Sequence, residues 1–287
     1  MPRRISRIRF ETERLFPLPA AQKKRAKLKP PGLPVWTASK ARLIERYLRL
    51  FVYITKHGNY IDGFAGPQYP DIEQYAAKLV VESEPARLRH FHLFDKGRQP
   101  LRALHRLHEQ HPDRDIHIYK GDFNTNINHV LHPDVLRPTE ATFCLLDQRT
   151  FQCHWSTVCR LAAYRTQGYK MELFYFLANW WFERAFTETE DEQRLRAWWG
   201  RDDWSQFAAL PRPERAVLLQ ERFRDELDYQ FADARAIYGT EDNKTKIMYY
   251  MIHATDHPEA PKLMQRAYNK TVERELGQQL RMYPLEP

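Results

Sequence analysis

The sequence predicts a Rossmann-like α/β fold, with a mostly parallel sheet and helices on both of its faces. Short apolar segments typical of strands alternate along the chain with segments of helical periodicity. The first of these strands runs into a glycine-containing turn, Asp62-Gly-Phe-Ala-Gly-Pro67. In a doubly wound sheet of this kind, ligands bind outside the carboxyl ends of the strands, where such turns lie.

The alternation is clearest over the first two thirds of the chain. Strands are expected over 59–61, 89–95, 116–122, 141–147 and 170–178. Helices are expected over 37–57, 99–110, 124–132 and 154–166. Apolar residues recur at helical spacing in 37–57, and the other three segments each follow one of the expected strands. The long gap between the first two strands predicts an insertion around 67–86.

The amino-acid composition changes over residues 179 to 243. Tryptophan and phenylalanine are interspersed there with charged residues, which favours a helical insertion. The aromatic residues are interpreted as the core of this insertion rather than as a base-stacking platform. After it, a strand over 246–253 and a helix from Glu259 complete the domain.

The charge of the chain is concentrated at its start. The formal net charge of the 287 residues is +8, and residues 1–30 alone carry ten basic against two acidic side chains. We therefore divide the chain into a basic arm with a Pro-rich joint over 1–36 and a neutral body over 37–287. Such an arm can bind nucleic acid by releasing counterions from phosphates. A strap lying on the surface of the body is the alternative.

Features of exported or membrane proteins do not stand out in the sequence. Apolar runs stay short of the roughly 18–20 residues that cross a bilayer, so no membrane association is expected. The first residues also lack the apolar segment of a secretory signal. Cys144, Cys153 and Cys159 are odd in number and widely spaced, which favours buried thiols in a reducing compartment. A cytoplasmic location is expected.

Four of the expected strands end on an aspartate: Asp62, Asp95, Asp122 and Asp147. Any one of them has a simple alternative role, because an aspartate there can cap the next helix. Parallel strands bring their carboxyl ends to one edge of the sheet, so the four carboxylates are expected at one site. Asp62 is suited to an ammonium or hydroxyl donor, and Asp95 to ribose hydroxyls. Gly63 and Gly66 allow a ligand close to the backbone.

Histidine clusters elsewhere are not expected to bind metal. His253, Asp256 and His257 are explained more simply by a turn between a strand and a helix. The other histidines in clusters are interpreted as half-exposed surface residues: His90 and His92 on the second strand, and His105, His108 and His111 on the following helix.

The run Tyr60-Ile-Asp-Gly-Phe-Ala-Gly-Pro67 resembles the three-Cys-motif partner family, a group of bacterial proteins related to methyltransferases. Three later segments resemble the same family: 145–155, 172–177 and 249–258. Together they extend over about residues 36 to 268. The resemblance implies a class I methyltransferase fold, S-adenosylmethionine as cofactor, and a partner protein with a Cys motif of the kind related to radical enzymes.

The same resemblance implies roles for individual residues. In the loop Asp62, Gly63, Phe64 and Gly66, the aspartate and the glycines hold the methionine end of the cofactor. Asp95 takes the ribose, and Asp122 faces the adenine amine.

The chain departs from its relatives at two places. Gln68 stands where the family has glycine, and the segment Asp147-Gln-Arg-Thr-Phe151 lacks the two prolines of related adenine methyltransferases. Asp147 and Arg149 are the candidates for catalysis or substrate binding. The acceptor could be nucleic acid, a partner protein or a peptide. The alternative function is a non-catalytic partner or nucleic-acid-binding module that retains the fold.

Overall fold

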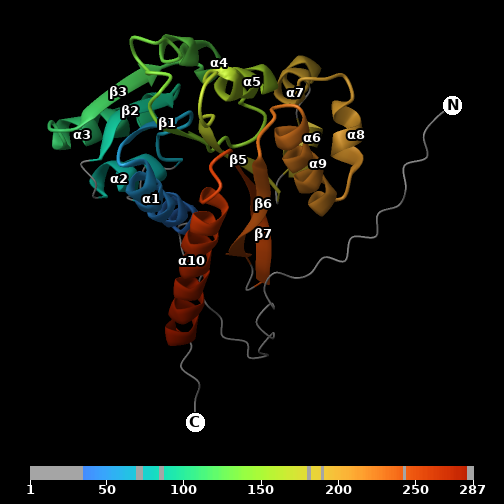
Figure 1. The fold of residues 1–287 in the computed structure, drawn as a ribbon. Helices are drawn as coiled ribbons and strands as arrows, with labels where there is room; N and C mark the ends of the chain where they lie inside the picture. The colour runs from blue at the N-terminus through green and yellow to red at the C-terminus, as the bar shows by residue number, and fades with distance from the viewer. Residues whose placement is uncertain are drawn as a thin grey trace. The chain divides into compact units, whose positions relative to one another are not determined.

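A computed structural model describes residues 35–68, 74–83, 87–179, 182–188, 191–241 and 244–282. Of the expected basic arm and Pro-rich joint over 1–36, residues 1–34 lie outside the described residues. At its centre is a seven-stranded sheet in the order β3-β2-β1-β4-β5-β7-β6 (Figure 1). The strands are β1 Gly58–Asp62, β2 Leu88–Asp95, β3 Asp115–Lys120, β4 Thr142–Leu146, β5 Glu172–Ala178, β6 Phe231–Glu241 and β7 Lys244–Thr255.

The first five strands pair in parallel, and β7 runs antiparallel to both β5 and β6. The helices are α1 Val35–Thr55, α2 Ala76–Glu82, α3 Arg98–Gln110, α4 Phe123–Asn126, α5 Trp155–Ala163, α6 Phe182–Glu188, α7 Glu192–Trp199, α8 Trp204–Ala209, α9 Arg212–Asp225 and α10 Ala260–Met282, with a 3-10 turn at Ile127–His129. The mostly parallel α/β architecture predicted from the sequence is confirmed.

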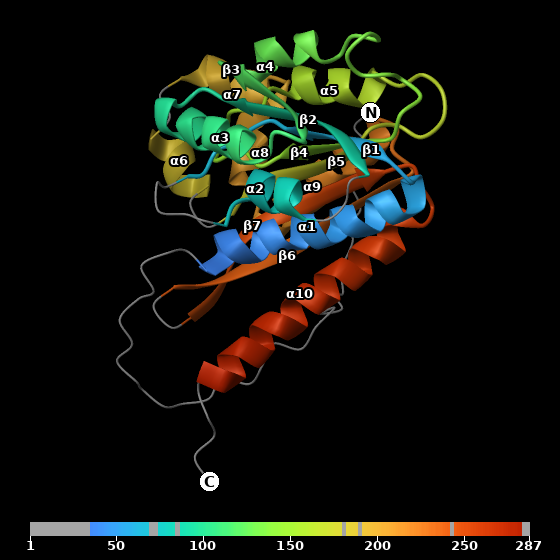
Figure 2. The same cartoon turned by 90° about the vertical axis from the view of Figure 1, so that its left-hand side faces the viewer.

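Each face of the sheet has its own hydrophobic core. Successive strand residues point to opposite faces, so Tyr60 belongs to one core and its neighbour Ile61 to the other. Helices α1, α2, α3 and α10 cover the first face, and Figure 2 shows α1 and α10 side by side there. Helices α4 to α9 cover the second face.

The strand order reverses between β1 and β4. From β1 the chain progresses outward through β2 to β3, and then returns to place β4 on the other side of β1. This reversal separates the loops that follow β1 and β4, which leaves room for a ligand at the carboxyl ends of the strands.

The insertion predicted over 179–243 is only partly helical. Helices α6 to α9 lie within it, but the expectation is wrong for 231–241, which form β6. This segment alternates small, apolar and charged residues and lacks a long apolar run. It becomes a strand because its backbone pairs with β7 over its whole length. Antiparallel pairing with the next strand in the chain, from which only residues 242 and 243 separate it, decides its structure rather than local propensity.

Other boundaries differ by a few residues. Helix α1 begins at Val35, two residues before the expected start at residue 37 and inside the expected joint 1–36. The helix expected over 124–132 is short, because α4 passes directly into the 3-10 turn. The expected insertion at 67–86 contains α2.

The aromatic residues of α7 and α8 are core residues, as expected. Trp198, Trp199 and Phe207 are almost fully buried and contact one another. Trp180 and Trp181, which belonged to the same expectation, lie outside the described residues. The thiols of Cys144 and Cys153 are buried and that of Cys159 is half-buried; none of the three forms a disulfide. Among the described helices, none is both long and apolar enough to cross a bilayer.

A candidate cofactor cavity

A cavity opens at the carboxyl ends of β1, β2 and β4, at the reversal of strand order. All eight residues that the sequence analysis proposed for the site line it: Asp62, Gly63, Phe64, Gly66, Asp95, Asp122, Asp147 and Arg149. Lys40 of α1 and Tyr249 of β7 line it as well, and so does Gln68. The topology therefore brings residues as far apart in the sequence as Lys40 and Tyr249 into one cavity.

The carboxyl group of Asp62 is buried at the base of this cavity. One of its oxygens accepts a hydrogen bond from the Tyr60 hydroxyl at 2.8 Å, and the other accepts from the Phe64 backbone N–H at 3.1 Å. Burial raises the pKa of Asp62 from 3.8 to about 7, against the lowering effect of these two bonds. A cationic group placed beside Asp62 would offset the cost of burying its charge.

The two glycines of the loop lie where side chains do not fit. A Cβ atom on Gly66 would stand 2.2 Å from Cβ of Pro100 and 2.8 Å from an oxygen of Asp95. A Cβ atom on Gly63 would touch the ring of Phe123 at 3.1 Å. Close approach between the β1 loop and its neighbours therefore requires glycine at position 66 and favours it at position 63.

Asp95 connects two loops of the cavity. Its Oδ2 accepts from the backbone N–H of Gly66 at 3.1 Å, and its Oδ1 accepts from that of Gly97 at 2.8 Å. A carboxylate has about four lone-pair positions, so each oxygen of Asp95 retains capacity for one more donor. Asp95 therefore both fixes the β1 loop and remains able to bind hydroxyl groups.

Asp122 has the role of a cap in the structure. Its Oδ1 accepts from the backbone N–H of Asn124 at 2.8 Å, at the start of α4. The Asn124 side chain then accepts from the backbone of His154 and donates to the carbonyl of Gln152. These bonds tie the loop after β3 to the loop after β4, and they leave the exposed carboxylate of Asp122 at the rim of the cavity.

Asp147 forms an ion pair that the sequence analysis did not anticipate. Its Oδ1 lies 2.7 Å from Nζ of Lys40, which is almost fully buried. The ammonium group also lies over the ring of Tyr249, 4.2 Å from its centroid. Burial lowers the pKa of Lys40, but Asp147 and Tyr249 outweigh this effect, and the pKa is raised above its usual 10.5. Lys40 is therefore a charged group that orients Asp147.

Arg149 and Gln68 meet at the mouth of the cavity. The exposed guanidinium of Arg149 donates to the backbone carbonyl of Gln68 at 3.4 Å. The Arg149 backbone N–H donates to Gln152, within a turn organised by the buried Gln148. The β1 and β4 loops thus touch across the mouth, while Asp62 and Asp95 still face the cavity behind them.

The cluster near the end of β7 behaves as the turn that the sequence favoured. Asp256 accepts from the backbone N–H groups of Lys170 and Gln230, and Thr255 accepts from that of His257. His253 is buried and bonds to Glu172 at 2.7 Å. The expectation that His92 is half-exposed is wrong: its side chain is buried, with His117 and Tyr119 of β3 beside it.

No family model matches the chain, and no curated protein matches it. Among solved structures, the chain resembles M. jannaschii TYW2 in complex with AdoMet, with 10% identity, a TM-score of 0.41 and coverage of 79% of this chain and 78% of that one. It also resembles a SAM-dependent methyltransferase from Anabaena variabilis, with 9% identity, a TM-score of 0.39 and coverage of 82% and 100%. Similarity at this level concerns the backbone fold alone. The Rossmann-like fold rests on the sheet order, and the role of the cavity rests on this chain's own residues.

Proposed function

We propose that this chain binds S-adenosylmethionine in the cavity and transfers its methyl group to an acceptor that enters at the β4 loop. One observation carries the proposal. A glycine turn and four aspartates from four successive strand ends line a single cavity at the reversal of strand order. Sites for cofactors that contain a nucleoside lie at this place in doubly wound sheets.

The residues of the cavity fit the groups of that cofactor. The ammonium of its methionine end suits the buried Asp62, whose ionised form is disfavoured without a cation. Its two ribose hydroxyls suit the remaining acceptor capacity of Asp95. The exposed carboxylate of Asp122 suits the adenine amine at the rim.

S-adenosylmethionine supplies a methyl group already activated by its sulfonium. The protein then has to align the acceptor and exclude water. The ion pair of Lys40 and Asp147 fixes one Asp147 oxygen and leaves the other for a donor on the acceptor. Arg149 at the mouth suits an acceptor that carries negative charge.

A transfer assay tests the catalytic part of this proposal. The purified chain is incubated with S-adenosylmethionine labelled in its methyl group and with an extract of its source cells, fractionated into nucleic acid, protein and peptide. We expect label in one fraction with the wild type and none with Asp62→Ala. Cofactor binding without label in any fraction would favour the alternative function, a binding module that keeps the fold without turnover.

Asp95→Ala is expected to weaken cofactor affinity ten- to a hundredfold, because hydrogen bonds to a charged group contribute roughly 1.5–3 kcal/mol. The backbone N–H groups of Gly66 and Gly97 also lose their acceptor. The unliganded protein should therefore lose about 1–3 kcal/mol of stability. Asp95→Asn, which keeps one side-chain oxygen, should lose less cofactor affinity and less stability than Asp95→Ala. Titration calorimetry and thermal unfolding measure the two effects, and an unchanged dissociation constant in Asp95→Ala would contradict a ribose contact.

Membership of the three-Cys-motif partner family and partnership with a Cys-motif protein remain part of the proposal. Their support is the Tyr60–Pro67 run and the three later segments of the sequence. Addition of such a partner to the transfer assay is the direct test, and the expected result is a higher rate of methyl transfer.

Deletion of residues 1–30 is expected to remove most of the affinity for nucleic acid. All eight units of net charge lie in this segment, and each phosphate contact adds to the salt dependence of binding. Filter binding of an RNA or DNA oligomer at two salt concentrations compares the truncated and full-length chains. Cofactor affinity serves as the control and should not change. Equal nucleic-acid affinities of the two chains would contradict a role for the arm.

A further inference from the structure

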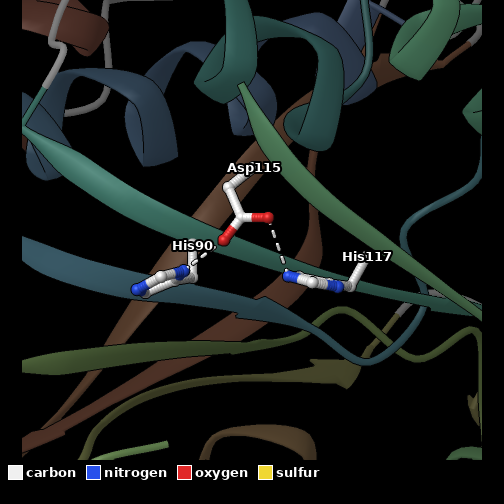
Figure 3. A group of neighbouring side chains, drawn as sticks. All are labelled: His90, Asp115 and His117. Atoms are coloured by element: carbon white, nitrogen blue, oxygen red, sulfur yellow. Dashed lines mark hydrogen bonds and ion pairs between the residues drawn. The ribbon is translucent and has the colours of Figure 1, made fainter. Parts of the chain in front are cut away.

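A second group of polar side chains lies on the sheet, away from the cavity. It consists of His90 of β2 with Asp115 and His117 of β3, the edge strand (Figure 3). The parallel register places His90 beside Asp115, and His92 beside His117. These side chains therefore share one face. His90 is the third residue of β2 and Asp115 the first of β3, so the group lies toward the amino ends of the strands, whereas the cavity lies at their carboxyl ends.

The donor atoms of these three residues are close together. Nε2 of His117 lies 2.9 Å from Oδ1 of Asp115, and Nδ1 of His90 contacts Oδ2 of the same carboxylate. All three donor atoms lie within 4.8 Å of one another. Two atoms that each lie about 2.0–2.1 Å from a zinc ion are roughly 3.0–3.4 Å apart. Small side-chain rotations would therefore bring the three donors onto one ion.

Neighbouring side chains restrain the group. The buried ring of His92 stacks on His117, with 5.3 Å between centroids and 14° between planes. Its Nδ1 lies 3.1 Å from the Tyr119 hydroxyl. Two arginines precede members of the group, but Arg89 pairs with Glu140, and the guanidinium of Arg114 lies over the ring of Phe91.

We propose that His90, Asp115 and His117 bind a divalent transition-metal ion of the zinc class, which fastens the edge strand β3 to β2. Two imidazoles and one carboxylate suit zinc and its neighbours, whereas magnesium and calcium take oxygen ligands. The three side chains are half-exposed or exposed, so water completes the coordination. The site shares no ligand with the cofactor cavity, so this proposal does not depend on the proposed methyl transfer.

The full-length chain is titrated with zinc chloride, and separately with cobalt chloride while the visible absorption is recorded. We expect one zinc ion per chain, visible bands from bound cobalt, and a higher unfolding temperature with zinc. His117→Ala and Asp115→Asn should each weaken zinc binding at least about tenfold. Magnesium should not bind at this site in the wild type or in either variant.

His105→Ala is the matched control, because His105 is an exposed histidine on the neighbouring α3. It should bind zinc and cobalt as the wild type does. The variants change exposed side chains, and circular dichroism checks their fold; His90→Ala replaces any variant that does not fold. Equal zinc affinity in wild type, His117→Ala and His90→Ala would overturn the proposal, and so would cobalt binding without visible bands.

Discussion

Asp62→Asn is expected to remove most of the affinity for S-adenosylmethionine and also the pH dependence of binding. The buried carboxylate is the group that we pair with the cofactor's ammonium, and its loss leaves that cation with a neutral amide. Truncating one partner of a buried charge pair costs roughly 2–5 kcal/mol, which corresponds to a fall of about thirtyfold or more in affinity.

The pH dependence follows from the raised pKa of Asp62. The ammonium binds the ionised carboxylate, and below its pKa of about 7 Asp62 is mostly protonated in the free protein. Wild-type affinity should therefore rise with pH between about 5 and 7, by up to about tenfold for each step of one in pH, and level off above. In Asp62→Asn this rise should be absent. Asp122→Asn, which removes an exposed carboxylate from the same cavity, is the control and should keep it.

The stability of the unliganded protein should show the opposite trend. Because the folded-state pKa of Asp62 lies above its unfolded value, the folded state binds the proton more tightly, and stability falls as pH rises from about 4 to about 7. A rise in pKa from 3.8 to about 7 corresponds to a loss on the order of 4 kcal/mol across that range. The free energy of unfolding of Asp62→Asn should fall less between about pH 4 and pH 7 than that of the wild type. Identical pH profiles of unfolding for the two proteins would contradict the account of Asp62.

Gly66→Ala is the second large effect that we expect. The added methyl would stand 2.2 Å from Cβ of Pro100, and it would also press against Asp95. Pro100 is held in the first turn of α3 and cannot rotate away. The loop must therefore shift and lose the bond from the Gly66 N–H to Asp95. We expect cofactor affinity to fall about a hundredfold and stability to fall by about 1–3 kcal/mol.

Gly63→Ala is the comparison for that variant. Its methyl would meet the edge of the Phe123 ring at 3.1 Å, and the ring can yield by a few tenths of an ångström. The loss of stability should be clearly smaller than in Gly66→Ala. Titration calorimetry and thermal unfolding give both quantities. Wild-type affinity and stability in Gly66→Ala would show that the β1 loop does not need its close contact with α3.

The sequence predicts the location of a site residue well where that residue ends a strand or follows directly after it. Asp62, Asp95 and Asp147 each follow a buried apolar segment, and parallel pairing alone is enough to bring such positions to one edge of the sheet. The Rossmann-like fold could be predicted for the same reason. The cofactor roles of these residues stay predictions, which the variants above test.

Contacts between distant segments could not be predicted in this way. Lys40 reaches Asp147 because α1 crosses the sheet beside β7, and nothing in the sequence around Lys40 indicates that packing. Strand β6 is a different case: its partner β7 follows it after residues 242 and 243, but the residues of β6 themselves lack the apolar pattern that predicts a strand. The group of His90, Asp115 and His117 depends on the register between β2 and β3, and a shift of one residue would turn its members to opposite faces.

Titration calorimetry of the full-length protein with S-adenosylmethionine and S-adenosylhomocysteine at pH 8 tests the central claim most directly. We predict that one molecule of either ligand binds per chain, and that Asp62→Asn and Gly66→Ala bind far more weakly while Asp122→Asn stays within about tenfold of the wild type. Absence of binding to the wild type, or equal binding by the wild type and Asp62→Asn, would contradict the assignment of this cavity to S-adenosylmethionine.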